Sequence, residues 1–251
     1  MGELSSARAA SAALKAEASE ERARVSRSFF KTGPGQYGEG DRFLGVTVPA
    51  TRAIAKRAHA LGEPELEKLL ASPWHEERLL ALLVLVRRYE RAQGQEKQAV
   101  CAFYRRHFAA VNNWDLVDLS AWQILGRELR VHARGDTVPR ELLTLADSSV
   151  LWERRIAMVS TFAWIKEGQA RPALVLAARL LGDREDLMHK AVGWMLREVG
   201  KRVSREDLQA FLQDHAHAMP RTALRYAIEH FDAEARCRWL ERGRSALRRA
   251  P

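Results

Sequence analysis

Apolar residues recur along the chain at the spacing of helices. Four long segments each join a polar opening to an apolar body: WHEERLLALLVLVRRYERA from Trp74, WDLVDLSAWQILGREL from Trp114, WERRIAMVSTFAWIKEG from Trp152 and LMHKAVGWMLREVGKR from Leu187. A weaker copy, PRTALRYAIEHF, begins at Pro220, and successive starting residues are 40, 38, 35 and 33 apart. The sustained period-two alternation that indicates half-buried strands is absent.

Shorter helical segments are predicted in the intervals, near 64–71, 95–108, 139–146, 171–182 and 204–214. One helix pair per 33 to 40 residues is typical of an α-solenoid of HEAT type, in which each pair packs on the next. We therefore expect an all-α fold, an α-solenoid with a concave binding face that forms a single domain over residues 1–251. A compact helical bundle is the alternative.

The N-terminal region is less regular. Residues 3–28 are rich in Ala, Glu, Arg and Ser and predict one surface helix, frayed over residues 1–20. Residues 33–40, GPGQYGEG, predict a loop. Pro49 suits a first helical position with Thr47 as its cap.

The charge balance bears on partners. The net charge is +9, and Arg supplies 33 of the 41 positive charges. Because the guanidinium fork suits phosphate oxygens, this excess favours nucleic acid or another polyanion, although a genome biased toward Arg codons explains it equally well. No apolar run is long enough to span a bilayer, and the two cysteines form no CxxC pair. We expect an intracellular, cytoplasmic protein.

Several familiar motifs find no support. GPGQYG matches GxGxxG, but a dinucleotide site needs a strand before it and a βαβ unit, and the sequence predicts neither. His215 and His217 have no carboxylate or Cys partner at ligand spacing. We expect no metal and no cofactor. Tyr37, at the tip of a loop beside basic residues, is a candidate contact to nucleic acid.

The segment NNWDLVDLS (112–120) carries the best candidate chemistry. Trp114 and Asp118 are four residues apart and share one helix face. Capping of the first turn explains Asp115 well. Asp118 comes later and lies beside the indole, where a carboxylate suits a cationic sugar or base, although a helix-capping role without catalysis is the simpler explanation. Arg154 and Arg155 open the next long helix, where positive charge opposes the helix dipole, so a phosphate is one explanation and ion pairing is another.

Four stretches together resemble the AlkD-type DNA alkylation-repair glycosylases: FFKTGPGQYGEGDRFLGV (29–46), NNWDLVDLS (112–120), LWERRIA (151–157) and HKAVGWMLREVGKR (189–202). The likeness extends from about residue 20 to about 232. It implies HEAT-like repeats with a concave basic face that binds DNA.

The resemblance also implies roles for particular residues. The family's catalytic Asp falls on Asp118, and its two indoles fall on Trp114 and Trp194. Its phosphate-contacting Arg falls on Arg155, and its N-terminal aromatic, a Tyr, falls on Phe29 or Phe30. Neighbouring cationic residues are further candidate DNA contacts: Arg154, Lys190 and Arg197.

The implied reaction suits these residue types. Alkylation at N7 or N3 makes a purine cationic and therefore a good leaving group. A carboxylate stabilises the developing oxocarbenium sugar, and indole faces favour positive charge. No Lys lies beside this set as an amine nucleophile. The expected activity is therefore that of a monofunctional glycosylase, without lyase activity, acting as a monomer on alkylated duplex DNA in base excision repair, in a bacterial cell.

Two other functions remain. One is a non-catalytic HEAT-repeat binder of damaged or branched DNA. The other is a protein-binding HEAT adaptor, which the basic balance and the paired tryptophans disfavour. The retained Asp118 favours the enzyme over the non-catalytic binder.

Overall fold

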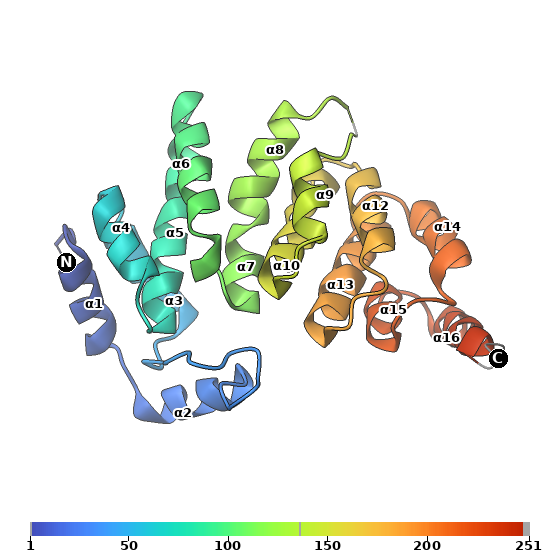
Figure 1. Cartoon of the computed structure of the whole chain (residues 1–251), viewed down its shortest axis with the longest axis horizontal. Coiled ribbons are helices and arrows are strands. Elements are labelled where there is room, and N and C mark those ends of the chain that lie inside the picture. The colour runs from blue at the N-terminus through green and yellow to red at the C-terminus, as the bar shows by residue number, and fades with distance from the viewer. Residues whose placement is uncertain (1, 136, 248–251) are drawn as a thin grey trace. The chain divides into compact units, whose positions relative to one another are not determined.

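The computed structural model describes residues 2–135 and 137–247. This part of the chain is all-α, as predicted, and its only strand-like pairing is an isolated bridge between Arg42 and Trp74. Contacts divide the chain into two compact units, Met1–Ser120 and Ala121–Pro251. Successive helix pairs build each unit, in the manner of an α-solenoid (Figure 1).

The first unit contains α1 (Ala7–Ala16), α2 (Glu20–Phe29), α3 (Val48–Arg57), α4 (Glu63–Leu70), α5 (His75–Arg91), α6 (Gln95–Arg106), the 3-10 turn η1 (Phe108–Ala110) and α7 (Trp114–Ser120). Helix α5 is its centre and packs against α3, α4, α6 and α7. Residues 79–86 of α5 are buried on every side. A helix that is apolar all round belongs in a core, which agrees with the run LLALLVLV in the sequence.

The prediction of one helix over 3–28 is wrong, because α1 ends at Ala16 and a second helix, α2, begins at Glu20. The Ser19 hydroxyl caps the new helix by accepting from the backbone N–H of Arg22 at 3.4 Å. Leu14 in α1 is fully buried, so the N-terminal helix is packed against α3 and α4 rather than frayed along its length.

Helix α2 lies outside the row formed by α1, α3 and α4 (Figure 1). Lys31, with a φ of 51°, turns the chain back after α2. Gly45 is required at a φ of 76°, because a Cβ there would lie 2.2 Å from the carbonyl oxygen of Ser19. Thr47 caps α3 through the N–H of Ala50, as predicted.

The second unit contains the π-helical turn η2 (Trp122–Gly126), α8 (Arg127–His132), α9 (Arg140–Ala146), α10 (Leu151–Ser160), α11 (Phe162–Ile165), α12 (Arg171–Arg179), α13 (Asp186–Arg202), α14 (Arg205–His215), α15 (Arg221–Ala227) and α16 (Ala233–Leu247). Helix α13 is its centre and packs most closely on α15. Gly193 permits this approach, because a Cβ there would lie 2.5 Å from the carbonyl oxygen of Ala223 and from Cβ of Tyr226.

The predicted repeat of a short and a long helix is confirmed. The short segments coincide with α4, α6, α9, α12 and α14. Two long segments are interrupted: the one from Trp114 is divided into α7, η2 and α8, and in the one from Trp152 α10 ends at Ser160 and α11 follows at Phe162. The Thr161 hydroxyl donates to the carbonyl of Met158 at 2.7 Å, a local side-chain bond that competes with regular helix.

Candidate active site

The start of α7 presents the two residues that the sequence placed on one face. Trp114 is the first residue of α7, and Asp118 lies one turn later; both are half-buried. Asn113 fixes this helix start, since its Oδ1 accepts from the N–H of Trp114 at 2.8 Å. The Asn113 amide also donates to Asp41 Oδ2 at 3.0 Å, which ties α7 to the segment before α3.

Four rings surround the Trp114 indole or support its neighbours. Together with Trp114 they form what we call the aromatic cluster: Phe29, Phe30, Phe43, His75 and Trp114. The ring of Phe30 is stacked on Trp114, with centroids 5.2 Å apart and planes 17° apart. Phe29 meets the same indole edge-on at 5.7 Å and is 62% exposed. The end of α2 is thus anchored on α7 by a half-buried stack of two rings, and a third ring lies at the surface.

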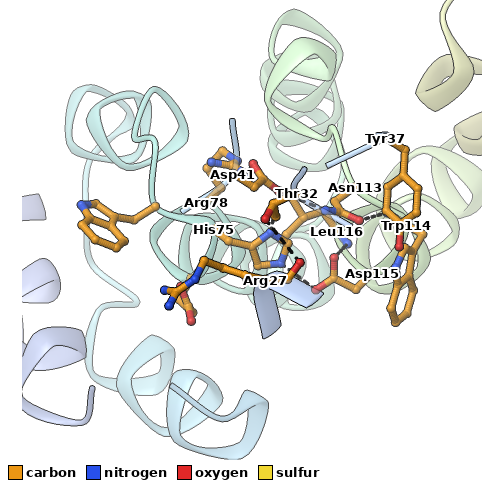
Figure 2. A network of polar contacts seen from close by, with 12 residues as sticks. Arg27, Thr32, Tyr37, Asp41, His75, Arg78, Asn113, Trp114, Asp115 and Leu116 are labelled. Atoms are coloured by element: carbon orange, nitrogen blue, oxygen red, sulfur yellow. Dashed lines mark hydrogen bonds and ion pairs between the residues drawn. The ribbon is translucent and has the colours of Figure 1, made fainter. Parts of the chain in front are cut away.

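A set of buried and partly buried polar side chains adjoins the aromatic cluster and shares His75 with it. We call it the polar network: Asp41, His75, Arg78, Asn113 and Asp115 (Figure 2). The His75 side chain is only 3% exposed and lies between two carboxylates. Its Nε2 is 2.8 Å from Asp115 Oδ2, and its Nδ1 is 3.3 Å from Asp41 Oδ2. Arg78 donates to the other oxygen of Asp41 at 2.5 Å.

The polar network holds His75 in its charged form. Burial works against the cation, but Asp115 and Asp41 prevail and raise the pKa of His75 from 6.5 to about 9. Burial likewise opposes the charge of Asp41, yet the hydrogen bond from His75 and the charge of Arg78 lower the pKa of that carboxyl. Two cations and two carboxylates therefore balance in a buried site, which is the condition for keeping charges there.

Glu76 pins the segment that carries Phe43. This buried carboxylate accepts from three successive backbone N–H groups, those of Leu44 at 2.9 Å, Gly45 at 2.8 Å and Val46 at 3.2 Å. A loop with no secondary structure of its own thereby has its donors satisfied. The stack of Phe43 on His75, with centroids 4.7 Å apart, depends on this anchoring.

Tyr37 lies on the predicted loop and closes it against α2. Its hydroxyl donates to the carbonyl of Phe29 at 3.3 Å, and the side chain is half-buried. The structure therefore places five of the predicted site residues in the first unit: Phe29, Phe30, Tyr37, Trp114 and, one turn after Trp114 on α7, Asp118.

The remaining predicted residues belong to the second unit. Trp194 is half-buried on α13, and its ring centroid is 6.0 Å from that of Phe162, which meets Trp122 edge-on at 5.3 Å. Cations flank this row, with Lys166 4.6 Å above the Trp122 ring and Arg202 5.5 Å above the Phe162 ring. Indole and phenyl faces with cations beside them suit both bases and phosphates.

The two arginines that open α10 contact protein acceptors. Arg154 binds the carboxylate of Asp183 through Nε at 2.6 Å and Nη2 at 3.4 Å, and its Nη1 donates to the carbonyls of Ser148 and Ser149. Arg155 is 4% exposed and donates to the carbonyl of Leu187 at 2.5 Å. These contacts favour ion pairing and packing as the reason for positive charge at this helix start.

Two cationic residues of α13 also have acidic partners. Lys190 pairs with Asp186 at 2.8 Å, one turn earlier on the same helix. Arg197 pairs with Glu198 at 3.3 Å and with Glu229, which lies just after the end of α15. Each is partly exposed, so a phosphate would compete with a carboxylate for it.

Sequence reasoning did not single out His75, Asp41 or Arg78. The partners of His75, Asp41 and Asp115, are 34 and 40 residues away in the sequence, so no local spacing predicts these contacts. The signal in the sequence is weak: a His and an Arg in the first turn of α5, where positive charge opposes the helix dipole.

Two kinds of site are absent from the described residues. No cluster of three or more His, Cys, Asp or Glu side chains there is able to hold a metal ion. None of the described helices combines the length and the hydropathy needed to cross a bilayer.

Comparison with known proteins identifies the family. The sequence model of the family described as DNA alkylation repair enzyme matches residues 10–231. No curated protein matches the chain. A solved structure titled "Predicted DNA alkylation repair enzyme from Enterococcus faecalis" has a similar fold, with a TM-score of 0.64 and 17% sequence identity over 86% of this chain and 98% of that one. The chain belongs to the DNA alkylation repair enzyme family.

Proposed function

We propose that this protein is a monofunctional DNA glycosylase. It hydrolyses the N-glycosidic bond of cationic N3- and N7-alkylated purines in duplex DNA, acts as a monomer inside the cell, and starts base excision repair. Membership of a DNA alkylation repair family supports the substrate class. The observation that carries the reaction is the pair on α7, in which a carboxylate, Asp118, follows an aromatic ring, Trp114, by one helical turn.

The proposed reaction requires only modest catalytic assistance from the protein. An alkylated purine already carries a positive charge, so its departure needs no strong general acid. The sugar becomes an oxocarbenium ion as the bond breaks, and the Asp118 carboxylate stabilises that charge and orients the attacking water. Stabilisation of this type is worth about 10²- to 10³-fold in rate when one group supplies it.

The aromatic cluster and the polar network support this role by rigidity. The Trp114 ring is stacked on Phe30, and the backbone N–H of Trp114 donates to Oδ1 of Asn113. The neighbouring Asp115 is hydrogen-bonded to His75. A site works best when its groups are already held where charge will develop. The polar network therefore positions Trp114 and, one turn later, Asp118.

The second unit contributes further contacts to DNA in this proposal. Trp194 offers an aromatic face, with Lys190 and Arg197 as contacts to the DNA backbone. Arg155 is 4% exposed and donates to the carbonyl of Leu187, so a phosphate reaches it only if this side chain is released. Arg154 fits this role less well, since its N–H groups are bound to Asp183 and to backbone carbonyls. The net charge of +9 favours association with the phosphate backbone.

The test compares the parent chain with Asp118→Asn on methylated duplex DNA. Asp214→Asn is the matched control, because it removes the same charge from an exposed position on α14. We expect base release to fall by about 10²-fold or more in Asp118→Asn and to be unchanged in the control. Binding to DNA persists in both variants. Strands stay intact until alkali is added, since no amine nucleophile takes part.

Two results count against the proposal. Normal excision by Asp118→Asn removes the carboxylate from the mechanism. Binding of methylated DNA without any base release by the parent chain favours the alternative, a non-catalytic HEAT-repeat binder of damaged DNA.

A further inference from the structure

A cleft lies at the opposite end of α5 from the polar network. Its volume is about 320 Å³, and its polar lining consists of His59, Arg87, Arg88, Arg91 and Glu96. His75 begins α5, and Arg87 follows it by twelve residues, so a rise of about 1.5 Å per residue separates the cleft from the candidate active site by roughly 18 Å. The cleft is therefore a separate feature of the first unit.

Three arginines crowd one turn of helix in this cleft. Arg87 and Arg91 are four residues apart, and Arg88 and Arg91 are three apart, which are the spacings at which like charges on a helix repel. Within the described part of the chain none of the three forms an ion pair, whereas Arg78, Arg154 and Arg197 each have a carboxylate partner.

The hydrogen-bonding capacity of these arginines is also underused. Nε of Arg87 is buried and has no hydrogen-bond partner among the described residues. Arg88 makes one long contact, 3.5 Å, to the carbonyl of His59. Burial lowers the pKa of Arg88, and the nearby charge of Glu63 only partly opposes this.

The acidic residues nearby do not neutralise the cleft. Glu96 is the acidic residue of the lining, and its single negative charge faces the three positive charges of the arginines. Glu63 acts on Arg88 but is paired with Arg106 at 3.3 Å. Glu3 lies 3.6 Å from Nε2 of His59, so its charge bears on the imidazole. The lining therefore keeps a positive excess that an anion would balance.

The cleft also has an apolar part, formed by Val84, Ala92 and Val100. Its volume is at the lower end of the range for small-molecule sites. Guanidinium groups prefer phosphate oxygens, which they bind with paired hydrogen bonds. We propose that this cleft binds a phosphate group, held by Arg87, Arg88 and Arg91 over an apolar floor.

Inorganic pyrophosphate and a short unmodified DNA duplex are the probes, because a small molecule and the DNA backbone are the two sources of such a phosphate. The readout is the nuclear magnetic resonance shift of the arginine Nε–H groups in the full chain. We expect those of Arg88 and Arg91 to move to saturation with pyrophosphate. In the double variant Arg87→Gln/Arg91→Gln the affinity falls about tenfold or more, because charge-assisted hydrogen bonds are lost.

Arg8→Gln/Lys15→Gln is the matched control, since it removes two positive charges from exposed positions on α1. Arg91→Gln alone, at an exposed position, serves if the double variant does not fold.

Competition of the duplex with pyrophosphate for the same Nε–H signals assigns the phosphate to DNA. Saturation by pyrophosphate with no effect of the duplex assigns it to a free ligand. Unmoved signals with both probes, or equal affinity in the cleft variant and the control, overturn the proposal. Base excision is not measured, so its presence or absence does not affect the result.

Discussion

Replacement of His75 by Gln removes the cation that two carboxylates share. The rise in the pKa of His75 from 6.5 to about 9 corresponds to roughly 3 kcal/mol of stability carried by the protonated ring. Asp41 keeps Arg78 and Asn113 as partners, but Asp115 loses its charged partner, the Nε2–H at 2.8 Å. We expect His75→Gln to lower the free energy of unfolding at pH 6 by about 3 kcal/mol.

The pH dependence of this loss has a definite sign. The pKa of His75 is higher in the folded chain than in the unfolded chain, so the stabilisation is complete below about pH 6.5. It declines as the pH rises, and is lost as the pH passes through about 9. The difference in stability between the parent chain and His75→Gln is therefore greatest at pH 6 and shrinks by pH 10.

Urea unfolding followed by circular dichroism at several pH values measures this difference. His217→Gln is the control, because that histidine is exposed. A loss of stability that stays constant from pH 6 to pH 10 would refute the reasoning, since it would mean that His75 acts through packing alone.

Three further substitutions test the local arguments. Glu76→Gln leaves three backbone N–H groups with a weaker acceptor, and urea unfolding should register a loss of about 1–3 kcal/mol. Gly193→Ala forces a methyl group to within 2.5 Å of the carbonyl oxygen of Ala223, so a comparable fall in unfolding free energy is expected, and unchanged stability would contradict the close packing of α13 on α15. Phe29→Ala should change stability by less than about 1 kcal/mol, because the ring is 62% exposed, yet weaken DNA binding in a fluorescence anisotropy titration; unaltered binding would remove Phe29 from the interface.

Periodicity predicted the helix pairs because each pair repeats the same local pattern. The short segments were located to within a few residues, and Thr47 was identified as a cap, since both depend on neighbouring residues. The break between α1 and α2 was missed. A polar Ala-rich stretch has helical propensity throughout, and only the packing of Leu14 and the Ser19 cap decide where it is interrupted.

The candidate site was predictable only in part. The shared face of Trp114 and Asp118 follows from a spacing of four residues, and the structure has both on α7. The contacts of the polar network around His75 could not be predicted from the sequence, because they join residues that are distant along the chain. The partner of Arg154, Asp183, is also distant, at 29 residues, so the sequence leaves both a phosphate and an ion pair as explanations for its charge.

The decisive measurement is the release of free methylated purine from alkylated duplex DNA, resolved by chromatography. We expect the parent chain to release N7- or N3-methylated purine and to leave abasic sites in unbroken strands, and Asp118→Asn to release none. Binding of the same DNA by the parent chain with no release of base would contradict the proposed function.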